Sequence, residues 1–215
     1  HYGVLFLDEF PEFRKDTLEA LRQPIEDGFV TITRASARST YPAQFMLVAA
    51  MNPCPCGNYG SRITPCRCTA QQIQRYRNRI SGPMLDRIDI HVEMGEVGYN
   101  DIAGRSCGEP SSAIRARVNA ARAIQTRRYA GMGILFNAQL TNRMMNQYCV
   151  LTSDAEALMK KAFAALKLSA RAYTRLLKVS RTIADLAGSE QIKAEHIAEA
   201  IQYRSLESKY WGEIK

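Results

Sequence analysis

The sequence lacks a long apolar run, and this absence excludes a membrane-spanning helix. Its longest unbroken apolar stretch, from Phe45 to Met51, is far shorter than the roughly 20 residues that a helix needs to cross a bilayer. No charged and then apolar leader opens the chain. We therefore expect a cytoplasmic protein with no membrane partner.

Cysteine is also scarce. Six cysteines in 215 residues are too few for a disulfide scaffold, and Cys107 and Cys149 are interpreted as incidental. The other four form two C-x-C pairs, which match the four thiolates of a tetrahedral structural zinc site. Reduced thiols, or a disulfide formed during handling, remain the alternative because C-x-C is tighter than the usual C-x-x-C. The candidate ligands are Cys54, Cys56, Cys66 and Cys68.

The charge balance is basic. Lys and Arg number 29 against 21 Asp and Glu, which gives a formal net charge of +8 and a pI near 9.3. Hydrophobic residues make up 46% of the chain, as in ordinary globular proteins, so disorder is excluded. The charge suits a polyanionic partner, but other features must decide whether that partner is nucleic acid.

The first part of the chain has the pattern of an α/β core. Continuous apolar runs at Gly3–Leu7 and 45–50 predict two buried strands. Between them, helical spacing from Pro11 to Ile25 predicts a helix, and residues 29–33 and 39–41 predict a hairpin around a turn at 35–37 with Arg34 and Arg38 near its tip. A basic helix is expected over 70–80, ended by Gly82-Pro83, and alternation over 88–93 predicts an edge strand.

The second part has no strand pattern. Gly, Ser, Pro and acidic residues dominate from Gly95 to Ser112, so we place a domain boundary there, with domains at 1–95 and 96–215. Helical spacing then recurs from Ile114 to Ile201, with a capping box expected at Ser153 and Glu156. Fold class is therefore α/β followed by an all-α bundle, and His91 and His196, which lack ligand spacing, are interpreted as surface residues.

Polar side chains follow both predicted buried strands. Asp8 and Glu9 end the first, where a carboxylate can hold a nucleotide's Mg²⁺ and its neighbour can polarise the attacking water. Asn52 ends the second and could orient that water. The alternatives are a helix cap and an Asx turn. Arg87 could pair with Asp86, or reach a phosphate on a neighbouring subunit.

These pieces in this order resemble the magnesium-chelatase-like AAA+ ATPases, and among them the ComM/YifB branch. The resemblance covers nearly the whole chain, and its motifs are specific in combination. They are GVLFLDE at 3–9, MNPCPCG at 51–57, QIQRYRNRISGPMLDRIDIHVE at 72–93 and LSARAYTRLLKVSRTIADL at 168–186.

The resemblance implies a role for each of five residues. Asp8 and Glu9 match the Walker B pair, and Asn52 matches the sensor-one residue. Arg87 matches the arginine finger, and Arg171 matches the sensor-two arginine of a helical lid. Arg171 could equally be a solvated charge near a helix start. ATP and Mg²⁺ are the implied cofactors, and a hexameric ring is the implied assembly.

One part of the family's pattern is missing. None of the 13 glycines is followed by lysine, so the chain has no G-x-x-x-x-G-K-[S/T] phosphate loop. We expect the Walker A region to precede residue 1, which makes this chain the second half of an ATPase core plus its lid. By itself it should hydrolyse little or no ATP.

DNA is the partner that the resemblance favours, through helicase-like or branch-migration activity. By position, the expected hairpin resembles the pore hairpin of ring helicases, and Arg34 and Arg38 would contact phosphates; a solvated turn is the alternative. Arg75, Arg77, Arg79 and Arg127-Arg128 extend the basic surface. Two other functions stay open: a chelatase-type motor that acts on a protein partner, and a non-catalytic zinc-bearing binding module.

Overall fold

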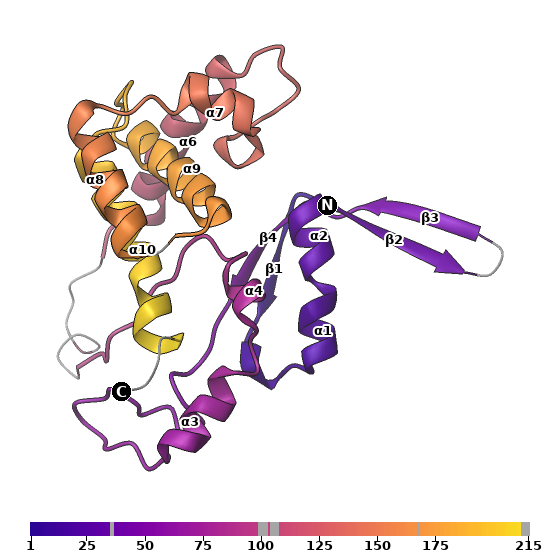
Figure 1. The fold of residues 1–215 in the computed structure, drawn as a ribbon, viewed down its shortest axis with the longest axis vertical. Helices are drawn as coiled ribbons and strands as arrows, with labels where there is room; N and C mark the ends of the chain where they lie inside the picture. Colours follow the sequence, from indigo (N-terminus) through magenta and orange to yellow (C-terminus); the bar gives the residue numbers. More distant parts are fainter. Residues whose placement is uncertain (35–36, 99–102, 104–107, 167, 212–215) are drawn as a thin grey trace. The chain divides into compact units, whose positions relative to one another are not determined.

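The computed structural model describes residues 1–34, 37–98, 103, 108–166 and 168–211 (Figure 1). Of the turn predicted at 35–37, Ala35 and Ser36 lie outside the described residues, as does Cys107, whereas Ala37 lies in a strand. The chain forms two compact units: one holds residues 1–88 together with 207–211, and the other holds residues 89–206. None of the described helices is long and apolar enough to span a membrane.

A pair of parallel strands forms the centre of the first unit. β1 (Gly3–Leu7) pairs with β4 (Phe45–Ala49) from Gly3↔Phe45 to Leu7↔Ala49, as the apolar runs predict. Leu7 and Leu47 pack on a core that contains Phe10, Leu18 and Met84. The opposite face is exposed: Val4, Phe6, Met46 and Val48 are 40–65% accessible. A parallel sheet usually buries both faces, so this face is a surface for further packing.

Short helices cover the packed face of the sheet. The single helix expected over 11–25 is two helices, α1 (Lys15–Ala20) and α2 (Arg22–Asp27), which follow one 3-10 turn. The C-cap of α2 is Gly28, whose positive φ of 73° suits glycine. Gly82-Pro83 does not simply end a helix. It starts another, capped by Ser81. The bounds are η1 (Phe10–Glu12), α1 (Lys15–Ala20), α2 (Arg22–Asp27), α3 (Ala70–Arg77) and α4 (Gly82–Leu85).

The predicted hairpin is confirmed. β2 (Phe29–Arg34) pairs antiparallel with β3 (Ala37–Pro42), and Figure 1 shows the hairpin projecting from the first unit, away from β1 and β4. Thr31 and Thr40 face each other across the ladder, with their hydroxyl oxygens 3.1 Å apart. The hairpin is an exposed arm of the first unit.

The second unit is helical. Three of its helices, α7, α8 and α9, begin at side-chain caps: the hydroxyls of Thr141, Thr152 and Ser169 accept backbone N–H bonds. Met159, Leu176, Ile192 and Ile197 lie in its core. The bounds are α6 (Ser111–Arg128), η2 (Asn137–Gln139), α7 (Asn142–Tyr148), α8 (Ser153–Ala165), α9 (Ala170–Leu186) and α10 (Ala194–Trp211).

A buried polar network joins α6, η2 and α9. The fully buried carboxylate of Asp185 accepts hydrogen bonds from Arg128 (2.5 Å), Arg181 (3.1 Å) and Asn137 (2.8 Å). Burial alone would raise the pKa of Asp185, but the hydrogen bonds from Arg128 and Asn137 lower it below its ordinary value. The network replaces water around a buried charge and fixes how these helices pack.

Further expectations were wrong. Residues 88–93 are not a strand; the backbone N–H of His91 donates instead to the carbonyl of Tyr203 in α10. The cap of α8 is Thr152 rather than Ser153. The expectation that His91 and His196 lie at the surface was also wrong: His196 is 3% exposed, and both ring nitrogens of His91 are buried. The Nδ1 of His196 accepts a hydrogen bond from the backbone N–H of Lys193, just before α10.

Candidate functional site

The carboxyl ends of β1 and β4 bring the candidate catalytic residues to one edge of the sheet. Since Leu7 pairs with Ala49, Asp8 and Glu9 leave β1 beside the residues that lead to Asn52. Two backbone bonds close this edge: Ala50 N–H donates to the Leu7 carbonyl and Phe10 N–H to the Ala50 carbonyl, both at 2.9 Å. Asp8, Glu9 and Asn52 are exposed, so their polar groups are available to a ligand.

Glu9 has an unusual backbone conformation. Its φ of 50° and ψ of 44° lie in the left-handed region, which costs a residue with a Cβ roughly 1–2 kcal/mol. Two hydrogen bonds hold it: Glu9 N–H donates to Asp8 Oδ1 (2.8 Å), and Glu12 N–H donates to the Glu9 carbonyl (2.7 Å). Strained residues of this kind concentrate at functional sites. Nothing in the sequence indicated this conformation.

The four cysteines meet in one cluster. Their Sγ atoms lie within 4.8 Å of one another, and three of the separations are 3.4 Å (Cys54–Cys56), 3.7 Å (Cys54–Cys66) and 3.6 Å (Cys56–Cys66). A tetrahedron with Zn–S bonds of about 2.3 Å has S···S edges of about 3.8 Å, whereas a disulfide bond is about 2.05 Å. The four sulfurs therefore fit a zinc ion.

Two of the thiols have strongly altered proton affinity. Backbone N–H groups of Asn58 and Arg67 lower the pKa of Cys56 to about 6, because they stabilise the thiolate. Removal from water, followed by the hydrogen bond with Cys56, raises the pKa of Cys68 to about 12. Without a cation, the cluster thus favours the thiolate form of Cys56 and disfavours the loss of the proton from Cys68. A bound metal ion would remove this opposition.

Arg77 ties the cysteine segment to α3. It is 3% exposed, so the expectation that it belongs to the basic surface was wrong. Its Nε donates to the Pro53 carbonyl (3.3 Å), and its guanidinium lies 4.6 Å from the centre of the Tyr59 ring. The sequence did contain a signal for this burial: Ile73, Tyr76 and Arg77 share one helix face. Arg77 anchors the loop that begins at Asn52.

Arg87 is held by contacts within its own chain. Its side chain is 6% exposed and forms an ion pair with Glu26 of α2, while Nη1 donates to the Pro83 carbonyl at 2.6 Å. The sequence offered Asp86 as the pairing partner, and nothing in it indicated Glu26. Glu26 is itself 37% exposed, so this ion pair reaches the surface.

The other candidate arginines are exposed. Arg34 and Arg38 lie in the paired part of the hairpin on β2 and β3. Arg171 lies in the first turn of α9, just after the cap Ser169, and belongs to the second unit. One turn later, Arg175 pairs with Asp89 at 2.8 Å. The structure therefore places Asp8, Glu9 and Asn52 at one edge, and Arg171 in a different unit.

Two family profiles divide the chain between them. One, described as magnesium chelatase, subunit ChlI, matches residues 1–102, and the other, described as the C-terminal part of that subunit, matches residues 108–204. The α/β unit with its parallel strands agrees with the AAA+ fold of this family. The chain therefore belongs to the magnesium-chelatase-like family of AAA+ proteins.

Within this family, the chain is similar to bacterial relatives. It is 45% identical to the protein YifB of Salmonella typhimurium over 96% of the chain, and 47% identical to competence protein ComM of Haemophilus influenzae over 95% of it. The chain spans about 40% of the length of these relatives. A zygotic DNA replication licensing factor of Xenopus laevis, mcm6-A, is 23% identical over 93% of the chain and 24% of its own length.

Proposed function

We propose that this chain supplies the second half of the ATP-hydrolysing core of a ring-forming motor that acts on DNA. The observation that carries the proposal is the meeting of Asp8, Glu9 and Asn52 at the carboxyl edge of β1 and β4. There Asp8 would hold Mg²⁺, Glu9 would polarise the attacking water, and Asn52 would orient that water.

The phosphate-binding part of the site would come from another part of the intact protein. The chain has no glycine followed by lysine, and the exposed face with Val4, Phe6, Met46 and Val48 offers a surface for the remaining core to cover. ATP with Mg²⁺ would supply the phosphoanhydride that is cleaved. We therefore expect the 215-residue chain alone to turn over little ATP.

Two arginines would complete the site in the assembled ring. Arg87 would act as the arginine finger of the neighbouring subunit's site, which requires it to exchange Glu26 for a γ-phosphate; the exposed edge of this ion pair supports such an exchange. Arg171, exposed on the first turn of α9, would read the γ-phosphate from the helical lid. A hexamer is the assembly that we propose.

We also propose that Cys54, Cys56, Cys66 and Cys68 hold a structural Zn²⁺. The support is the near-tetrahedral spacing of the sulfurs and the chemistry of four thiols. The ion would hold the loop between Asn52 and α3, which begins directly after the capping residue Thr69. Its role would be to stabilise the loop and not to take part in catalysis. Zinc-thiolate sites of this kind suit the reducing cytoplasm.

DNA action rests on the projecting hairpin and on charge. Arg34 and Arg38 are exposed on an arm in a chain of net charge +8, and phosphate contacts require accessible cations. ATP turnover of the intact protein should rise with single-stranded or branched DNA. Arg34→Gln with Arg38→Gln should abolish that rise and leave basal turnover unchanged. Robust turnover indifferent to DNA would instead favour a chelatase-type motor with a protein partner.

A further inference from the structure

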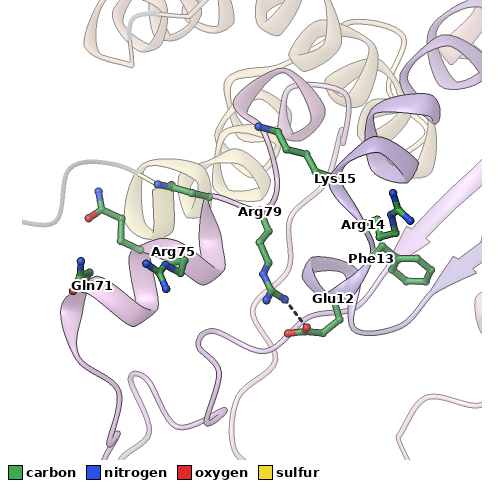
Figure 2. Close-up of a pocket in the computed structure, with 9 residues that line it drawn as sticks. Glu12, Phe13, Arg14, Lys15, Gln71, Arg75 and Arg79 are labelled. Carbon is green, nitrogen blue, oxygen red and sulfur yellow. Dashed lines mark hydrogen bonds and ion pairs between the residues drawn. The ribbon is translucent and has the colours of Figure 1, made fainter.

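An open groove separates α3 from the chain that enters α1 (Figure 2). Its volume is about 700 Å³. Phe13 and Arg14 lie on the wall that precedes α1, Gln71 and Arg75 project from α3, and the ion pair between Glu12 and Arg79 joins the two walls. All these residues belong to the first unit. The mechanism proposed above uses none of them.

Positively charged side chains outnumber negatively charged ones in the lining of the groove. Its only carboxylate, Glu12, is paired with Arg79, and Arg14 is paired with Asp16. Lys15 and Arg75 are exposed and form no ion pair in the described part of the chain. Each therefore has its donors available to an anionic ligand.

The groove also contains neutral side chains that can contact parts of a ligand other than its anionic groups. Gln71, Gln74 and Asn78 line α3 at helical spacing together with Arg75, and their amides can both donate and accept hydrogen bonds. On the opposite wall, Phe13 exposes 38% of its surface. Cations, amides and an exposed aromatic ring are the groups that contact phosphates, base edges and base faces in proteins that bind single strands.

We propose that this groove binds single-stranded nucleic acid. Lys15 and Arg75 would contact phosphates, Phe13 would stack on a base, and the α3 amides would meet base edges. This inference extends the proposed DNA motor by adding a contact outside the hairpin. The groove also adjoins the hydrolytic edge, because the N–H of Glu12 donates to the carbonyl of Glu9 at 2.7 Å. A strand that contacts Phe13 would therefore lie next to the segment that contains Glu9.

The test measures binding of a fluorescein-labelled dT 20-mer to the intact protein by anisotropy across a salt series. Lys15→Gln with Arg75→Gln should lower the slope of log K against log salt by about 1.4, since each phosphate contact on a single strand contributes about 0.7. Phe13→Leu should weaken binding about tenfold at every salt concentration without changing the slope, and Phe13→Tyr should restore it.

Matched controls remove the same charge elsewhere. Arg115→Gln with Arg143→Gln should leave slope and affinity unchanged, since both arginines are exposed on helices of the second unit. An unchanged slope in the Lys15 and Arg75 variant, with binding lost only in the Arg34 and Arg38 variant, would overturn the groove and leave the motor standing. The groove proposal would also be overturned if the Lys15 and Arg75 variant lost affinity for ATP and kept its affinity for the oligonucleotide. Polyglutamate that displaced the labelled oligonucleotide as well as unlabelled dT 20-mer does would overturn it too. No binding by any form would overturn both proposals.

Discussion

Removing one thiol from the cysteine cluster should remove the zinc-dependent part of the protein's stability. Cys54 is fully buried, with its sulfur 3.4 Å from that of Cys56 and 3.7 Å from that of Cys66. Cys54→Ser replaces a strong zinc ligand by a hydroxyl that stays protonated. We expect this variant to contain no zinc after purification, whereas the unmodified chain should contain one ion.

The size of the effect follows from mass action. Free zinc at about 1,000 times its dissociation constant stabilises the folded state by about 4 kcal/mol. For a unit built mainly from residues 1–88, each kcal/mol shifts Tm by about 4–8 °C, so chelation should lower Tm by about 15–30 °C. Differential scanning fluorimetry with and without EDTA, paired with a colorimetric zinc assay, measures both quantities.

Cys149 provides the matched control. It is buried in the second unit and lies outside the cluster. Cys149→Ser should keep one zinc ion and the full EDTA response, even if its starting Tm is lower. An EDTA response of equal size in Cys54→Ser and the unmodified chain would refute the reasoning, as would a zinc-free chain whose Tm does not change when zinc is added.

Three further outcomes are expected. Asp185→Asn should destabilise the second unit by about 3–5 kcal/mol in urea unfolding, because the buried Arg181 and the partly buried Arg128 lose the anion that they share. An effect below about 1 kcal/mol would contradict this. The pKa values of His91 and His196 are lowered from 6.5, chiefly by burial, so as the pH falls the unfolded chain takes up protons before the folded chain does. The free energy of unfolding should therefore be undiminished above about pH 6.5 and should fall below it. His91→Gln with His196→Gln should reduce the fall in Tm measured from pH 7.5 to 5.5, and a fall as large as that of the unmodified chain would contradict this. Thr69→Ala removes the hydroxyl that accepts the Gln72 N–H at 3.2 Å and should cost about 1 kcal/mol by the same urea assay, whereas no loss would contradict the cap.

Sequence patterns correctly predicted the elements that depend mainly on residues close to one another in sequence. The apolar runs that became β1 and β4, the hairpin, and the cap Thr69 each depend on residues close in sequence. The meeting of Asp8 and Asn52 was also predictable, because parallel strands end at a common edge.

The sequence predictions that were wrong share a different cause, since each of these contacts involves a partner that is distant in sequence. Alternation at 88–93 predicted a strand, but the His91 N–H finds its acceptor at Tyr203, more than a hundred residues away in sequence. Arg87 pairs with Glu26 of α2, which lies 61 residues away in sequence. Such contacts override local preference because they satisfy buried backbone and charged groups. Sequence spacing alone does not contain this information.

The most direct test of the central claim is ATP binding and turnover by Glu9→Gln in the intact protein. Glutamine keeps the size of the side chain but cannot polarise water as a carboxylate does, so turnover should fall by about 100-fold or more while ATP binding persists. Glu156→Gln, at an exposed glutamate of α8, should leave both unchanged. Turnover by Glu9→Gln equal to that of the unmodified protein would contradict the assignment of this edge of the sheet as the hydrolytic site.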